Sequence, residues 1–341
     1  MRLRNREGEI GKEPLRWGLM GAGHIAGVFA EDMSMTNSGR VVAIGSRNQD
    51  AADGFGEKYD VPRCYGSYEA LVADPDVEAV YVATPHPWHH QNALLALEAG
   101  KAVLVEKPFT MNADEARELV HTARAKGLFL MEAVCTRFLP HMVEVSRLVA
   151  AGVLGEIVTV MADLGYRFPK DPKSRFFAPE LGGGVLLDCG VYLVSLASMV
   201  LGKPEQVRGL VTRAFTGVDG QTSMLLGFTS GAHAVLTCNS SAHTPTRASI
   251  VGTEARIEID RPFYAPTSLT IIAQDGSANR FEPRYAGTGL RFEADEFERC
   301  IRAGLPESPV MPLDETIWIM ETMDAVLAQA LAGPGHVPGL S

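Results

Sequence analysis

Short apolar runs alternate with longer segments of helical periodicity through the first half of the chain, and this alternation restricts the fold more than any other feature. The runs that predict buried strands are 15–20, 40–46, 79–83, 102–106 and 129–133. The segments that predict helices are 24–33, 48–59, 87–99, 112–126 and 140–150, with Asn48 and Asn112 as caps. Strands and helices that alternate at this length form βαβ units. We therefore expect a parallel sheet whose ligand site lies at the carboxyl ends of its strands.

The second half has a different pattern, in which most predicted strands follow one another directly. These strands are 156–165, 206–215, 223–228, 232–239, 255–259 and 269–273, with turns at 218–220 and 275–276. The helices predicted here are about 190–201, 292–303 and 313–332. This pattern predicts an α+β domain on a large, mostly antiparallel sheet.

A glycine-rich turn, GAGHIA at 21–26, follows the first predicted strand and opens the first helix. Gly21 permits a tight turn, and Gly23 lets the backbone approach a pyrophosphate, while alanine takes the place of the third glycine. The amides of His24 and Ile25 then face the phosphates at the helix start. A glycine turn alone is a weak signal, but its place between strand and helix favours a dinucleotide site over a simple turn.

The length and the change of pattern together set the domain organisation. A chain of 341 residues exceeds what one hydrophobic core usually serves, so we expect two domains. Residues 1–14 are expected to form an N-terminal arm, 15–138 a nucleotide-binding Rossmann domain, and 139–335 a substrate and dimerisation domain. The predicted fold class is α/β, with a Rossmann parallel sheet followed by an α+β domain.

The end of the second predicted strand bears on the choice of cofactor. Enzymes that use NAD usually place Asp or Glu here for the ribose hydroxyls, whereas this chain has Ser46 and Arg47. A hydroxyl and a guanidinium suit the 2′-phosphate of NADP, which a carboxylate would repel. We expect NADP, with NAD possible. The alternative is that Arg47 is an ordinary solvated side chain.

Candidate catalytic groups follow the fourth strand and lie in the segment 182–202. Lys107 would sit in the cleft beside the nicotinamide, where a cation stabilises alkoxide charge; the alternative is a simple ion pair with Glu106. Asp188 and Tyr192 are four residues apart, so a helix places them on one face. A nearby ammonium would lower the pKa of the tyrosine and suit it to proton transfer. Otherwise, Asp188 caps the helix and Tyr192 is a core residue.

Three histidines, His86, His89 and His90, cluster after the third strand. No cysteine or carboxylate joins them at ligand spacing, so we expect no metal site. One of the three is expected to line the cofactor cleft and another to be exposed.

Composition excludes several classes of partner. The net charge of −10 argues against nucleic acid, because phosphate binding needs clustered lysine and arginine. We find no apolar run as long as a membrane span, and the charged first fourteen residues do not resemble a signal peptide. The five cysteines are widely spaced, which favours buried thiols in a reducing compartment. We therefore expect a cytoplasmic protein without a membrane or nucleic-acid partner.

The motifs GAGHIA, ATPHPWHH, AGKAVLVEKP and GGGVLLDCGVY, in this order, resemble the Gfo/Idh/MocA oxidoreductases, named for glucose–fructose oxidoreductase and inositol dehydrogenase. The segments 127–140, 175–184 and 307–313 are similar to the branch of dimeric dihydrodiol dehydrogenases and NADP-linked D-xylose dehydrogenases. The resemblance covers roughly residues 15–330. It implies a Rossmann domain and a sheet domain whose open face pairs in dimers.

The resemblance also implies roles for individual residues. Lys107 matches the lysine of the EKP motif, with a cis bond to Pro108. Tyr192 matches the proton donor or acceptor, Asp188 the aspartate of the same helix, and Arg47 the arginine that binds the 2′-phosphate. The expected cofactor-binding set is Gly21, Gly23, His24, Ile25, Ser46, Arg47, Thr84, Pro85, His89, Glu106 and Lys107. The expected substrate-binding set is Arg175, Phe176, Asp188 and Tyr192.

Two departures from the family pattern bear on the substrate. The usual Thr-Pro-Asn is Thr84-Pro85-His86 here, as in the dihydrodiol branch, and the branch's tryptophan is Cys135. The loss of that ring favours a sugar over an arene diol. We expect an NADP-dependent oxidoreductase that acts on a sugar (an aldose, polyol or diol). The alternatives are an NAD-dependent glycoside hydrolase of the same family and a non-catalytic nucleotide or sugar sensor.

The apolar content of the second-half strands predicts self-association. Strands 207–211 and 225–236 carry more apolar positions than one covering layer of helices needs. We expect the uncovered sheet face to pair with a second copy about a two-fold axis, as a homodimer or a dimer of dimers.

Overall fold

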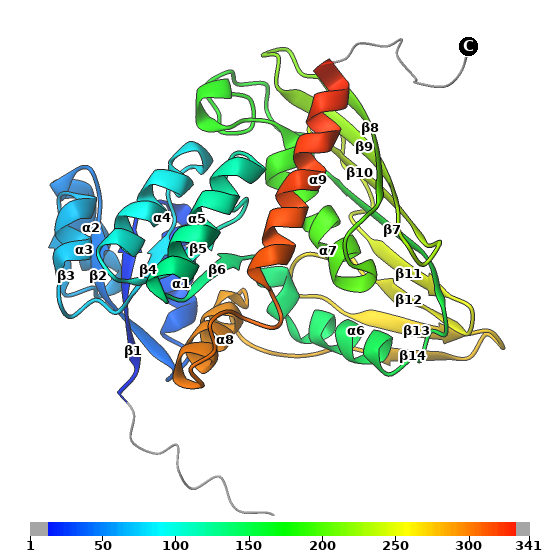
Figure 1. Ribbon diagram of the computed structural model, residues 1–341, viewed down its shortest axis with the longest axis horizontal. Coiled ribbons are helices and arrows are strands. Elements are labelled where there is room, and N and C mark those ends of the chain that lie inside the picture. The colour runs from blue at the N-terminus through cyan, green and yellow to red at the C-terminus, as the bar shows by residue number, and fades with distance from the viewer. Residues whose placement is uncertain (1–12, 332–341) are drawn as a thin grey trace, which may run out of the picture.

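The computed structural model describes residues 13–331. Residues 1–12 of the expected arm and residues 332–335 of the expected second domain lie outside this range. The described chain forms a parallel sheet and a larger, mostly antiparallel sheet with helices packed around them, which confirms the predicted α/β class (Figure 1).

The first sheet has six parallel strands in the order β3-β2-β1-β4-β5-β6. Its strands are β1 (Leu15–Met20), β2 (Gly39–Gly45), β3 (Arg63–Tyr65), β4 (Ala79–Val82), β5 (Ala102–Glu106) and β6 (Leu130–Ala133). The helices between them are α1 (His24–Met33), α2 (Gln49–Tyr59), α3 (Tyr68–Ala73), α4 (His89–Glu98) and α5 (Ala113–Lys126). Since the strand order reverses between β1 and β4, a crevice opens at their carboxyl ends.

The alternation pattern missed β3 and α3. Every residue of β3 is half-buried, so this short strand carries no continuous apolar run. Ser67 caps α3 by accepting a hydrogen bond from the Ala70 backbone N–H at 3.1 Å. These elements matter for function because α3 begins with Tyr68, which lines the cleft described below.

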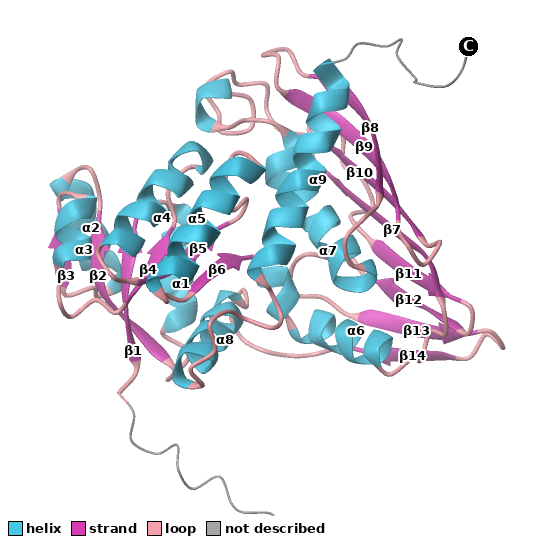
Figure 2. Ribbon diagram, in the orientation of Figure 1, coloured by secondary structure: helices cyan, strands magenta, loops and turns pink. Residues whose placement is uncertain are grey.

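The second sheet has eight strands in the order β14-β13-β12-β11-β7-β10-β9-β8, and its β7–β10 pair is parallel. Its strands are β7 (Ile157–Gly165), β8 (Gln206–Arg213), β9 (Asp219–Gly227), β10 (His233–Asn239), β11 (Ala248–Gly252), β12 (Ala255–Ile259), β13 (Leu269–Ala273) and β14 (Ala278–Phe281). The helices of this half are α6 (Pro140–Ala150), α7 (Val191–Leu201), α8 (Leu290–Arg302) and α9 (Leu313–Leu331). Figure 2 shows α6, α7 and α9 on the inner side of this sheet, toward the Rossmann domain.

The turn predicted at 218–220 is wrong. Asp219 and Gly220 begin β9, and the chain reverses earlier, where Gly217 has φ +90° and the Ala214 N–H donates to Val218 O at 2.7 Å. The turn predicted at 275–276 is confirmed, with Gly276 at φ +83°. Strands β11 and β14 were also missed.

The helical segment Pro179–Leu201 corrects the expectation that no apolar run reaches the length of a membrane span. The mean hydropathy of its most apolar 18-residue window is 1.9, so the segment is long and apolar enough, by length and composition only, to cross a membrane. However, 78% of its most apolar window is buried inside the protein. It is the core helix of the second domain and is covered by the sheet and α9, whose packing against α7 is visible in Figure 1.

The outer face of the second sheet carries exposed apolar side chains. Val235 pairs in register with Leu225 on one side and Met161 on the other, and these side chains are 50%, 48% and 43% exposed. Val158 and Leu210 are also exposed, at 51% and 74%. No helix or strand within residues 13–331 covers this face (Figure 1).

Helix α8 returns from the second half of the chain to pack against the Rossmann domain. Phe297 packs against Trp17 of β1, with ring centroids 4.7 Å apart. Asp32, at the end of α1, accepts hydrogen bonds from the backbone N–H groups of Thr288 and Gly289 at 2.9 and 2.6 Å. This carboxylate thus fixes the start of α8, where Leu290 lines the cleft.

Candidate active site

A cleft of about 590 Å³ lies at the carboxyl ends of β1, β2, β4 and β5, where the sequence placed the ligand site. Most of the predicted site residues line it: Gly21, Gly23, His24, Ile25, Ser46, Arg47, Thr84, Pro85, His89, Glu106, Lys107, Arg175 and Tyr192. Asp188 joins the same site through its contact with Lys107. Phe176 does not line the cleft. It stacks on Phe168, with ring centroids 3.7 Å apart.

The glycine turn has the conformation that a phosphate cradle needs. Gly21 has φ +109°, and a Cβ there would lie 3.0 Å from Ala83 O, so a larger residue would be strained. Gly23 precedes α1, and among the described residues no side chain caps this helix. Its first-turn N–H groups are therefore available to an anionic ligand, and the turn fits a dinucleotide pyrophosphate.

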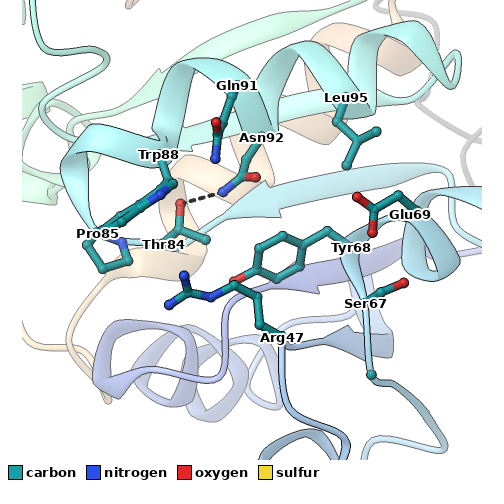
Figure 3. A pocket seen from close by; sticks show the side chains of 11 residues that line it. Arg47, Ser67, Tyr68, Glu69, Thr84, Pro85, Trp88, Gln91, Asn92 and Leu95 are labelled. Carbon is teal, nitrogen blue, oxygen red and sulfur yellow. Dashed lines mark hydrogen bonds between the residues drawn. The ribbon is translucent and has the colours of Figure 1, made fainter.

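One end of the cleft continues into a pocket of about 510 Å³ that contains Arg47, Tyr68 and Trp88 (Figure 3). The Arg47 guanidinium lies 5.4 Å from the centre of the Trp88 ring. Thr84 Oγ1 accepts a hydrogen bond from Asn92 Nδ2 at 3.0 Å. This bond fixes the Thr84 side chain, which lines the same pocket as the rings of Tyr68 and Trp88. An aromatic wall beside a guanidinium fits an adenosine phosphate. We call this part the adenosine end of the cleft.

The opposite part of the cleft, which we call the catalytic end, is organised by Lys107. Its ammonium donates to both the backbone carbonyl and the carboxylate Oδ1 of Asp188, each at 2.9 Å. The alternative ion pair with Glu106 is wrong, because Glu106 accepts from the backbone N–H of Lys107 at 3.0 Å and not from its ammonium. The peptide bond to Pro108 is cis, as the family resemblance implied.

Asp188 is held between two cations. Arg175 Nη1 lies 3.2 Å from the same Oδ1 that Lys107 contacts, and His86 Nε2 lies 4.0 Å from it. Burial raises the pKa of Asp188, but the charges of Lys107 and Arg175 outweigh it and hold the pKa well below its usual value. Asp188 is therefore an anion throughout the neutral range. It fixes the position of the lysine ammonium.

Tyr192 lies beside this pair, but its electrostatics differ from the prediction. The Lys107 ammonium lies 4.7 Å from the centre of the Tyr192 ring, over its face. The expectation that the ammonium lowers the pKa of Tyr192 is wrong for this structure, because burial and nearby acidic groups raise that pKa well above its usual value. Tyr192 stacks on Tyr264, at 5.0 Å between centroids. The phenol is thus neutral and able to donate a proton.

The histidine cluster separates into two environments. His86 and His89 are both buried and line the cleft, whereas the sequence led us to expect only one of the three histidines there. His90 lies outside the cleft lining, with its Nε2 3.0 Å from Glu118 Oε2. His89 Nε2 and Nδ1 lie 2.7 and 2.8 Å from the carbonyls of Thr84 and Pro108, so the ring bridges β4 to the cis turn. Burial lowers the pKa of His86 to about 3 and also lowers that of His89. His86 is therefore neutral at pH 7.

Sequence reasoning missed several residues of the cleft. Tyr68 and Trp88 line the adenosine end, and Leu181 and Leu290 line the main cleft. Tyr68 follows a strand too short to detect. Trp88 stood inside the motif ATPHPWHH, and its aromatic ring next to a strand end was a usable signal. The two leucines come from segments far along the chain, and no local pattern points to them.

The fold and the cleft together define an NAD(P)-binding oxidoreductase. Family models match the chain as "Oxidoreductase family, NAD-binding Rossmann fold" over residues 15–134 and as "GFO/IDH/MocA C-terminal domain" over residues 142–258. The chain belongs to the Gfo/Idh/MocA family of oxidoreductases.

Curated relatives include the trans-1,2-dihydrobenzene-1,2-diol dehydrogenases of animals. The mouse protein is 38% identical over 322 residues, which cover 91% of this chain and 95% of the relative. The human protein is 37% identical over 324 residues, which cover 92% and 96% of the two chains.

Solved structures with the same fold include oxidoreductases. The aldose-aldose oxidoreductase of Caulobacter crescentus, in complex with glycerol, has a TM-score of 0.85 and 27% identity, and covers 94% of this chain and 98% of its own. A 3-ketoreductase from Actinomadura kijaniata, in complex with NADP and TDP-benzene, has a TM-score of 0.79 and 28% identity. It covers 92% of this chain and 97% of its own.

Proposed function

We propose that this protein is an NADP-dependent oxidoreductase that transfers a hydride between the nicotinamide and a carbinol or carbonyl carbon of a sugar. One observation carries this proposal. The Lys107–Asp188 pair, with Tyr192 beside it, lies in the same cleft as the Rossmann glycine turn. A non-catalytic sensor would not need a buried cation and a phenol at this position.

Each residue of the catalytic end has a distinct part in this chemistry. When bound, the nicotinamide supplies or accepts the hydride. The Lys107 ammonium stabilises negative charge on the substrate oxygen, and Asp188 holds that ammonium in place. Tyr192 is neutral, so during reduction it donates its proton to the carbonyl oxygen. During oxidation the phenol must first release its proton to solvent, and the resulting phenolate then accepts the proton of the carbinol hydroxyl.

The preference for NADP rests on the adenosine end. Arg47 is exposed there, with Ser46 next to it at the end of β2, and Tyr68 and Trp88 lie beside the guanidinium. This set offers a cation and hydroxyl groups to a 2′-phosphate. Glu69 also lines this pocket. Its carboxylate is the group that would favour a 2′-hydroxyl, so the cofactor test must include NAD.

Two substrate classes are supported by separate observations. Cys135 lines the cleft where the branch has tryptophan, which removes an aromatic wall and favours a hydroxylated sugar. The name of one similar solved enzyme, an aldose-aldose oxidoreductase, agrees with a sugar. The 38% identity to the dihydrobenzenediol dehydrogenases supports an arene trans-diol as the second candidate.

The deciding experiment is NADPH absorbance with aldoses, polyols and a trans-dihydrodiol as separate substrates, each with NADP and with NAD. We expect NADP reduction with at least one sugar. Turnover confined to the trans-dihydrodiol would support the second candidate. Cleavage of a glycoside without net NADPH would indicate the hydrolase activity known in this family, and binding without any turnover would indicate a sensor.

We also propose that the outer face of the second sheet forms a homodimer. Met161, Val235 and Leu225 lie side by side across β7, β10 and β9, so their exposed side chains make one apolar row. A monomer seldom leaves such a row in water. Light scattering is expected to give twice the 36.7 kDa chain mass, and Val235→Lys to reduce it toward the monomer. A wild-type monomer at micromolar concentration would refute this interface.

A further inference from the structure

We propose that Asp219, on the second sheet, is a positioning residue that holds Asp188, and through it Lys107, in the catalytic geometry. Its carboxylate accepts the backbone N–H of Leu186 at 2.6 Å, two residues before Asp188. The two residues are 33 positions apart in sequence, so this contact ties β9 directly to the segment that carries the catalytic aspartate. The inference rests on the proposed function.

The segment around Asp188 needs an external hydrogen-bond acceptor. It begins with η4 (Leu186–Gly190), a turn of π-helix that continues into α7, and no side chain of the capping residue Val185 accepts its first N–H groups. Unpaired N–H groups at a buried helix start are costly. Asp219 supplies the acceptor from another element. Its own position is supported by Thr222 Oγ1, which lies 3.4 Å from Oδ2.

Gly184, just before this turn, leaves room for the Asp219 carboxylate. Gly184 has φ +127°, and a Cβ at this position would lie 2.0 Å from Asp219 Oδ1. Any side chain here would collide with the carboxylate. The Gly184 N–H also donates to Phe176 O at 3.0 Å, which closes the loop that carries Arg175. Asp219 therefore lies beside the end of the Arg175 loop and the start of the Asp188 turn at once.

The effect on catalysis follows from how Lys107 is held. Its ammonium donates to the backbone carbonyl of Asp188 as well as to the carboxylate, each at 2.9 Å. A shift of the η4 backbone would therefore move two of the ammonium's hydrogen-bond partners together. Misplacement of a catalytic group by about 1 Å can cost roughly a hundredfold in rate. A π-turn at a functional site is a recurrent arrangement, because its altered hydrogen bonding leaves carbonyl groups available.

Asp219 is buried, and its charge state suits its role as a hydrogen-bond acceptor. Burial raises the pKa of Asp219 to about 6, and hydrogen bonds from the backbone of Leu186 and Val185 oppose that rise. The group is thus mainly a carboxylate at pH 7.5. The nearby thiols Cys189 and Cys238 have raised pKa values owing to burial, so both are neutral.

The test compares Asp219→Ala and Asp219→Asn with a matched control, Asp324→Ala. Asp324 on α9 also accepts the first backbone N–H of another element, that of Ala113 on α5 at 2.8 Å, but lies outside the cleft lining. We expect Asp219→Ala to lower kcat roughly ten- to hundredfold while the Kd for NADP, from calorimetry, stays within about twofold. Asp219→Asn keeps one acceptor oxygen and is expected to restore part of the rate. Asp324→Ala is expected to lower the melting temperature without lowering kcat.

Two further measurements separate positioning from general stability. In an Asp188→Asn background, Asp219→Ala is expected to lower kcat little further, since Asp219 acts through Asp188. Amide hydrogen exchange over residues 182–192 is expected to accelerate in both Asp219 variants and not in the control. If folded Asp219→Ala keeps the wild-type kcat, the inference is overturned. If the wild-type protein shows no turnover, the proposed function fails, and unchanged exchange over 182–192 would still overturn the placement itself.

Discussion

The two ends of the cofactor cleft are built differently. At the catalytic end, the side chains of Lys107 and Asp188 are 14% and 9% exposed, and each has several fixed partners. At the adenosine end, Arg47 is exposed and rests against Trp88 without an ion pair among the described residues. One end is organised before any ligand arrives, and the other leaves its main charge in solvent.

This difference indicates which end of the cleft tolerates substitutions without loss of stability. A buried charge network is sensitive to every member, because loss of one partner leaves another buried and unpaired. An exposed cation can be replaced with little effect on the fold. We therefore expect substitutions at the catalytic end to affect turnover strongly, and substitutions at the adenosine end to affect the choice of cofactor.

The largest effect is expected from Lys107→Met. It removes the cation that we propose stabilises the substrate oxygen, and it leaves Asp188 with Arg175 as its remaining cation. We expect kcat to fall by roughly three orders of magnitude or more, measured by NADPH absorbance. The control is Lys126→Met, since Lys126 is a partly exposed lysine paired with Glu98 on the Rossmann surface. Near-normal turnover by Lys107→Met would refute the charge role.

Tyr192→Phe keeps the ring and its stacking on Tyr264 but removes the proton. We expect kcat to fall by roughly two to four orders of magnitude, with NADP affinity little changed. The double variant with Lys107→Met should be little worse than either single variant, because the pair acts as a unit. If Tyr192→Phe stays active while Lys107→Met is dead, the lysine itself is the acid and base.

A smaller effect, confined to binding, is expected at the adenosine end. Arg47→Ala should weaken NADP binding roughly ten- to hundredfold and leave NAD binding nearly unchanged, because it would remove the charged hydrogen bond that we propose Arg47 makes to the 2′-phosphate. Arg40→Ala, at the other end of the same strand β2, is the matched control. Calorimetric titration with both cofactors measures this. Equal losses for NADP and NAD would show that Arg47 does not select the phosphate.

Local signals predicted the Rossmann half well. The glycine turn gave the positive φ of Gly21, and Asn48 and Asn112 cap helices α2 and α5 through hydrogen bonds to Ala51 and Glu115. Each of these features depends on residues within one turn of the chain. The outline of the second domain was also predictable, since long strands with short turns leave a clear pattern.

Features that depend on distant contacts were not predictable. Asp219 followed a valine and preceded a glycine, which is typical of a turn, yet its partner Leu186 determines its place at the start of β9. The sequence left the partner of Lys107 open, because only the assembled fold shows that the neighbour in sequence, Glu106, turns to the backbone and to Tyr81. The pKa of Tyr192 depends on burial, and burial is set by the assembled domains.

The smallest effect, a pH dependence, is expected to distinguish the two ends without any substrate. Burial lowers the pKa of His86 to about 3, whereas an unfolded histidine titrates near 6.5. Below pH 6.5 the unfolded chain therefore binds a proton that the folded site refuses, so the free energy of unfolding falls as the pH drops from 6.5 toward 3. One such group changes that free energy by at most about 1.4 kcal/mol per pH unit.

Urea titrations at pH 7 and pH 5 measure this pH dependence. His86→Asn should remove the contribution of His86, while His89 and His141, which are also buried with lowered pKa values, keep their own contributions. His121→Gln, at an exposed position of α5, and Arg47→Ala should leave the slope as it is. An unchanged slope in His86→Asn would mean that the folded catalytic end takes up a proton at His86 as readily as the unfolded chain does, and that burial does not control the charge of this ring.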